Sequence, residues 1–126
     1  MRATPVLLLA LTGCGMSPLQ VAVTVADAAA LAGDRAAPVL EEHCTAPLRA
    51  AVAEGDAQTG RRLADVCDPA IATYDALRTA HVALRAAIVA AHGGYSVAAL
   101  APLVTEVAAT SAGLAETIAA VSGGPR

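Results

Sequence analysis

The clearest helix is predicted for residues 68–92. Its apolar positions step by three and four residues, as in the seam of a coiled coil. The seam consists of Tyr74, Leu77, His81, Leu84 and Ile88. Gly93-Gly94 is expected to end this helix, and Ser96 to cap the last one. A second apolar stripe predicts that last helix, with Leu100, Leu103, Val107, Leu114, Ile118 and Val121 along one face.

The first half of the chain is predicted to begin with an interrupted helix. Ser17-Pro18 is typical of a helix start, because serine caps a helix and proline fits its first position. Residues 19–31 begin with alternating valines, as a strand does, but the alanine run that follows favours a helix. Gly33-Asp34 and Pro38 are expected to interrupt it, and residues 39–43 form a second piece after the kink.

A short pattern occurs twice in the middle of the chain. Cys44 and Cys67 are each followed by a capping residue and then, within three residues, by a proline. This pattern predicts that a new helix begins just after each cysteine. Between the two, Gly55 is expected to end one helix in a turn and Asp56 to cap the next.

The composition supports an all-α fold. Apolar residues make up 56% of the chain, but aromatic residues only 2%, with neither Phe nor Trp. Alanine is the strongest helix former, whereas a β-sandwich requires more aromatic and β-branched residues. We therefore expect a small antiparallel bundle of three to four helices. Residues 97–121 have the length of a membrane span, but two glutamates and a proline among them favour a bundle helix.

The N-terminus has the layout of a secretory signal. Arg2 precedes a short apolar run over residues 5–11, which is too short to span a membrane. The run ends in Leu11-Thr12-Gly13-Cys14, and this tetrad resembles the lipobox of bacterial lipoproteins. The resemblance implies cleavage between Gly13 and Cys14. It also implies a diacylglyceryl group on the Cys14 thiol and an acylated amino group, with fatty acids such as palmitate. A start at Met16, without this leader, is the alternative.

A lipidated Cys14 leaves two cysteines for a disulfide. An even number of cysteines in an oxidising compartment favours a bond between Cys44 and Cys67. These residues lie eleven and twelve positions from Gly55, so a chain reversal there brings them face to face. We therefore predict one disulfide that staples the helical bundle.

These features divide the chain into four parts. Residues 1–13 form the signal peptide, 14–17 the lipidated tether, 18–122 the helical domain and 123–126 a flexible tail. The resemblance implies a membrane-anchored protein of the cell envelope. Gly15 follows Cys14 where an aspartate tends to retain Gram-negative lipoproteins in the inner membrane. The outer membrane, facing the periplasm, is therefore favoured for a Gram-negative source.

Candidate ligand chemistry is sparse. His81 lies in the predicted apolar seam, with Arg78 and Arg85 at helical spacing on either side. The three side chains are a candidate anion site, but a polar seam residue that fixes helix register is the favoured interpretation. His43 and its glutamate neighbours are expected to be a surface cluster, because adjacent residues diverge on a helix. We predict no metal, no cofactor beyond the lipid on Cys14, and no catalytic residue.

The sequence therefore favours a lipid-anchored structural or protein-interaction module and not an enzyme. Its expected partners are the membrane, through the anchor, and another protein or a second copy of itself. The net charge of −3 argues against nucleic acid, because affinity for phosphates comes from Lys and Arg. One alternative is a periplasmic sensor of a small ligand or metal. The other is a phage-encoded envelope lipoprotein that acts in lysis or exclusion.

Overall fold

The computed structural model describes residues 15–123, and every regular element in that range is helical. In chain order the elements are α2 (Pro18–Leu40), the π-helical turn η1 (Glu41–Thr45), α3 (Ala46–Glu54), α4 (Ala57–His92), the 3-10 turn η2 (Val97–Ala99) and α5 (Leu100–Val121). The α2, η1 and α3 elements follow one another without a break. The described chain therefore consists of three helical segments, and a fourth separate helix is not present in it.

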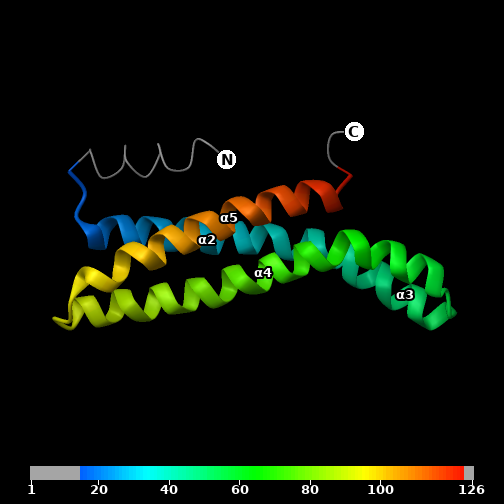
Figure 1. The fold of residues 1–126 in the computed structure, drawn as a ribbon, viewed down its shortest axis with the longest axis horizontal. Coiled ribbons are helices and arrows are strands. Elements are labelled where there is room, and N and C mark those ends of the chain that lie inside the picture. The colour runs from blue at the N-terminus through cyan, green and yellow to red at the C-terminus, as the bar shows by residue number, and fades with distance from the viewer. Residues whose placement is uncertain (1–14, 124–126) are drawn as a thin grey trace.

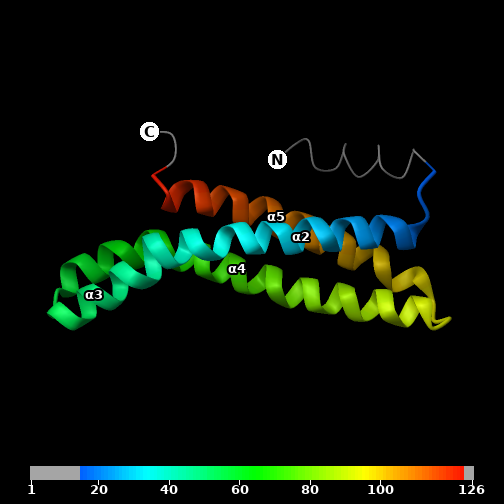
Figure 2. The same ribbon diagram turned by 180° about the vertical axis from the view of Figure 1, so that it is seen from behind.

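The three segments lie side by side along one long axis (Figures 1 and 2). α2 and α5 run in the same direction and α4 runs against them, and each of these helices contacts the other two. One end of the molecule contains the starts of α2 and α5 and the end of α4. At the opposite end, α3 and the first turns of α4 project beyond the end of α5. We call this projecting hairpin, residues 46–66, the tip.

Local signals set the start of α2 and the turn of the tip, as predicted. The Ser17 hydroxyl accepts from the Gln20 N–H, and the Gln20 side chain accepts from the Ser17 N–H, which completes a capping box. Gly55 has a φ of 68°, a left-handed conformation that favours glycine. Asp56 accepts from both the Thr59 hydroxyl and the Thr59 N–H, and these bonds lower the pKa of its carboxyl.

The predicted helix breaks at Gly33-Asp34 and Pro38, and the new helix after Cys67, are wrong. A new α-helix does begin at Ala46, just after Cys44, although it continues from η1 and the Thr45 side chain makes no capping bond. α2 continues through Pro38, and α4 runs from Ala57 through both Cys67 and Pro69. An interior proline costs a helix about 3 kcal/mol, but the apolar faces on either side of it gain packing against the other helices. The chain therefore keeps its helical course at both prolines.

The turn η1 widens the helix directly before Pro47. Its closing bond runs from the Ala46 N–H to the Glu41 carbonyl, five residues back. In an ordinary α-turn the Pro47 ring clashes with the carbonyl of His43, and proline has no N–H to donate to it. A π-helical turn relieves this conflict without ending the helix. It also places Cys44, which is fully buried, toward α4.

Small side chains form the α2 side of the core. Its inward positions step by four and three residues and are Ala22, Ala26, Ala29, Gly33 and Ala36. The four alanines are buried, so the backbone of α2 lies close to its neighbours. Apart from Val21 of α2, the larger buried residues of the main core come from the other two helices. They are Leu77 and Leu84 of α4, and Leu100, Val104, Val107 and Leu114 of α5.

The predicted seams of α4 and α5 agree with this core in most positions. Leu77 and Leu84 are buried, while Tyr74 and Ile88 at the ends of the seam are half-buried. In α5 the predicted Leu103 is only half-buried, and its neighbour Val104 takes the buried position. The buried positions Leu100, Val104 and Val107 step by four and then three residues, which is regular α-helical spacing, whereas the predicted stripe stepped by three and then four.

Candidate functional site

The disulfide between Cys44 and Cys67 is confirmed. The two sulfur atoms are 2.09 Å apart and the two Cα atoms 5.7 Å apart. Both residues are buried in a small cluster with Leu40 and Ala70, against which Leu48 and Val121 pack. The bond joins η1 to α4 where the tip leaves the three-helix part of the molecule. It is therefore a structural staple at the base of the tip.

His81 has a backbone partner. Its Nε2 lies 3.1 Å from the carbonyl oxygen of Ala26, where the ring donates a hydrogen bond to α2. This contact is possible because small residues line the inward face of α2 and bring its backbone close to α4. The ring is half-buried. The geometry agrees with a polar seam residue that fixes how α4 lies against α2.

The predicted anion site is only partly assembled. Arg78 and His81 line one recess of about 200 Å³, together with Tyr74 and Asp34. Arg85 does not line this recess and is exposed on α4. The Asp34 carboxylate opposes the charge that an anion site requires. The structure therefore brings together two of the three predicted residues, with a carboxylate beside them.

We expect His81→Leu to change the free energy of unfolding by less than about 1 kcal/mol. The substitution removes one hydrogen bond to a carbonyl that α2 already uses, and it adds apolar contact in the seam. Thermal unfolding followed by circular dichroism measures the change. Leu84→Ala, at a fully buried seam position one turn away, is the control and should cost about 2–5 kcal/mol. A loss of several kcal/mol in His81→Leu contradicts the packing interpretation.

The cluster around His43 does not converge on one point. Glu41 and Glu42 are exposed, and Glu41 lies 3.8 Å from Arg49 in an exposed ion pair. Cys44 is bonded to Cys67, so its sulfur is not a free metal ligand. Within residues 15–123, no group of three or more His, Cys, Asp or Glu side chains is placed to hold a metal ion.

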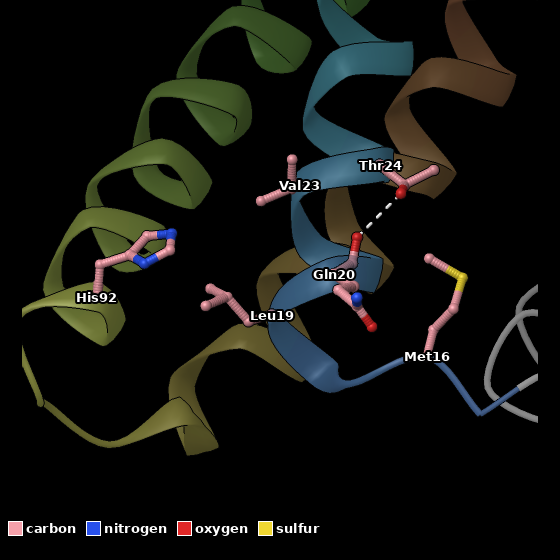
Figure 3. A pocket seen from close by; sticks show the side chains of 6 residues that line it. All are labelled: Met16, Leu19, Gln20, Val23, Thr24 and His92. Atoms are coloured by element: carbon pink, nitrogen blue, oxygen red, sulfur yellow. Dashed lines mark hydrogen bonds between the residues drawn. The ribbon is translucent and has the colours of Figure 1, made fainter.

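Two apolar cavities lie at the end of the molecule where α2 begins. The first has a volume of about 390 Å³ and lies between α2 and the end of α4 (Figure 3). Its lining residues are Met16, Leu19, Gln20, Val23, Thr24 and His92. The second, of about 550 Å³, lies between the starts of α2 and α5 and is lined by Met16, Val21, Val97, Leu100 and Val104 among others. Met16 therefore belongs to both.

The sequence alone did not mark Met16 or His92 as lining residues. Met16 precedes the helix, and His92 is the basic residue in the last turn of α4, where a cation suits the helix dipole. The signal that was available is the pair Met16 and Val21, one residue before and four residues after the Ser17 cap, which both line the second cavity. An apolar residue on each side of a cap often packs into the fold, as in the hydrophobic staple.

One helical stretch in the described chain, Val97–Val121, is long and apolar enough to cross a membrane by length and composition. Its mean hydropathy over the best window is 1.5, and about a fifth of that window is buried. The same stretch packs on α2 and α4 through Leu100, Val107 and Leu114. Its two glutamates, Glu106 and Glu116, are exposed.

The predicted lipidation and cleavage site lies outside the described residues. Gly13 and Cys14 directly precede the first described residue, and residues 124–126 of the predicted tail also lie outside that range. Comparisons with protein-family models, with curated proteins and with solved structures find no match to this chain.

Proposed function

We propose that this chain is a lipid-anchored protein of the bacterial cell envelope that acts as a structural or protein-interaction module. The observation that carries the proposal is the tetrad Leu11-Thr12-Gly13-Cys14 at the end of an apolar run. Only three residues separate Cys14 from the first helical residue, Pro18. Acyl chains on Cys14 would therefore hold the helical domain directly at a membrane surface.

The disulfide supports an envelope location. Disulfides form and persist in oxidising compartments and are rare in the cytosol. Cys44 and Cys67 are paired, which leaves Cys14 as the third cysteine of the chain and the one available for lipid. In this proposal residues 18–122 form a stapled antiparallel bundle of three helices. For a Gram-negative source, the bundle faces the periplasm from the outer membrane.

The surface of the domain supports a role in interaction. Val52 and Val82 are 80% and 66% exposed, so they lie on helical faces that the rest of the described chain leaves largely uncovered. The tip projects away from the rest of the fold and presents charged residues of both signs. We therefore propose that these faces contact another envelope protein or a second copy of the chain, and that the module has no catalytic role.

The test is Cys14→Ser in the full-length chain, produced in bacteria supplied with labelled palmitate. The unsubstituted chain should incorporate the label and yield a mature protein that begins at an acylated Cys14. The substituted chain should remain an unlabelled precursor, because both the acyl acceptor and the cleavage signal are lost. Intact mass and the N-terminal peptide measure both properties. Mature, labelled protein from Cys14→Ser contradicts the proposal.

Met16→Leu is the matched control. It keeps the tetrad and an apolar side chain of similar size at a neighbouring position, so processing should be normal. The same variant tests the alternative start, because a chain that begins at Met16 would no longer be made.

A further inference from the structure

Charged residues are absent from one end of the molecule. Residues 15–26 and 86–105 contain no Asp, Glu, Lys or Arg, and His92 is the only basic side chain among them. The start of α2, the end of α4 and the start of α5 bring these two segments together in space (Figure 1). We call this part of the fold the uncharged end. It adjoins Cys14, which directly precedes its first residue.

The opposite end is strongly charged. Residues 41–68, which include the tip, carry nine charged side chains out of the 8 Lys+Arg and 11 Asp+Glu of the whole chain. They are Glu41, Glu42, Arg49, Glu54, Asp56, Arg61, Arg62, Asp65 and Asp68. The molecule is therefore polarised along its long axis, with its charge concentrated far from Cys14.

Several apolar side chains are exposed at the uncharged end. Tyr95 is 74% exposed, Val89 is 70% exposed and Val97 is 46% exposed. Both apolar cavities open at this end, and Met16 lines each of them. This part of the fold therefore presents an exposed apolar surface of the kind that marks an interaction or membrane site, and the nearest exposed charge on α4 is Arg85, one turn from Val89.

We propose that the uncharged end docks on the interface of a lipid bilayer, so that the molecule stands end-on with the tip directed away from the membrane. The proposal rests on the proposed function for its anchor. Cys14 is two residues from Met16, and two residues span at most about 7 Å. Acyl chains on Cys14 therefore enter the bilayer beside the two cavities, and the uncharged end cannot lie far from it.

The chemistry of this end fits lipid. A charged side chain is costly to bring into a bilayer, and residues 15–26 and 86–105 contain no Asp, Glu, Lys or Arg. Tyrosine is enriched at membrane interfaces, where its ring lies among the headgroups. The backbone N–H groups of Gly93, Gly94 and Tyr95 donate to carbonyls at the end of α4, so these three donors are already paired and need no water at the interface.

The side of α5 fits lipid less well than the end does. Glu106 and Glu116 are both exposed on α5, so a molecule lying on that side would press two carboxylates into the interface. Two exposed valines of α4 distinguish the end-on orientation from one in which the molecule lies on its side. Val89 and Val82 lie one heptad apart on the same face, which places Val82 about 10 Å further from the uncharged end.

The experiment uses single tryptophans, since the chain has none of its own. Tyr95→Trp, Val89→Trp, Val82→Trp and Val52→Trp are each introduced into the full chain, and the protein is purified from bacteria. Each is reconstituted into phosphatidylcholine vesicles whose acyl chains carry bromine, which quenches tryptophan. All four sites are exposed, and circular dichroism checks that each variant keeps its helical content. Val52→Trp, in the tip, is the matched control.

Quenching should be strongest for Tyr95→Trp, weaker for Val89→Trp, weaker again for Val82→Trp and absent for Val52→Trp. Equal quenching of Val89→Trp and Val82→Trp would mean that the molecule lies on its side, and overturns the end-on arrangement. If no position is quenched, the docking is wrong.

The mass of the N-terminal peptide, measured on the same samples, separates this proposal from the anchor. An acylated Cys14 with unquenched tryptophans supports the lipid anchor and contradicts the docking. An unmodified Cys14 with a quenched Tyr95→Trp contradicts the lipid anchor and supports the docking. An unmodified Cys14 together with unquenched tryptophans contradicts both the lipid anchor and the docking.

Discussion

Reduction of the disulfide is expected to lower the melting temperature by more than about ten degrees. The bond closes a loop between residues separated by 23 positions. In the chain-entropy model, a loop of this length stabilises the folded state by about 3.4 kcal/mol. One kcal/mol corresponds to about 4–8 °C in a domain of this size. Calorimetry with and without a thiol reductant measures the shift.

The effect should be greatest in the tip. α3 packs chiefly on α4 and η1, and Ala51 is the one buried residue among its nine. Without the bond, few contacts oppose local opening, so amide protons of the tip should exchange much faster than those of α5. The double substitution Cys44→Ala, Cys67→Ala should match the reduced protein and be insensitive to reductant. Two free thiols in the unreduced protein, with unchanged melting, contradict the staple.

Ala22→Leu is expected to destabilise the fold by about 1–3 kcal/mol. Ala22 is fully buried on the inward face of α2, where small side chains allow the helices to approach. A leucine there has no cavity to fill and must push α2 away from α4 and α5. The displacement also acts on the His81 contact with the Ala26 carbonyl, one turn along the helix. Chemical denaturation measures the loss.

Ala28→Leu is the matched control for this substitution. Ala28 lies in the same helix but is exposed, so leucine meets solvent there and helix propensity is nearly unchanged. Its stability should stay within about 0.5 kcal/mol of the parent protein. Equal effects of the two substitutions would mean that the small-residue face of α2 does not control helix packing.

The parts of the fold that depend on local signals were predictable from the sequence. The Ser17 cap and the Gly55 turn each arise from the backbone chemistry of a few neighbouring residues, and both are present as predicted. The disulfide followed from the turn, because Cys44 and Cys67 are nearly equidistant from Gly55. A hairpin of two helices needs no further information to bring such residues together.

The parts that depend on contacts between distant residues were not predictable. Pro38 and Pro69 have strong local preferences against a helix interior, and only the packing on either side overcomes them. The alanine seam of α2 repeats at coiled-coil spacing, but alanine occurs so often in this chain that its periodicity is hard to recognise. The partner of His81 required the register between α2 and α4, which no single segment contains.

The staple at the base of the tip also determines how the chain responds to tension. A pull between Cys14 and the C-terminus passes from Cys44 to Cys67 through the sulfur atoms and bypasses the residues between them. Those residues account for about 80 Å of extended chain that tension cannot draw out while the bond is intact. The tip is thus mechanically isolated from any load carried by the rest of the chain. A protein held at a membrane and strained along its length would keep this hairpin unloaded.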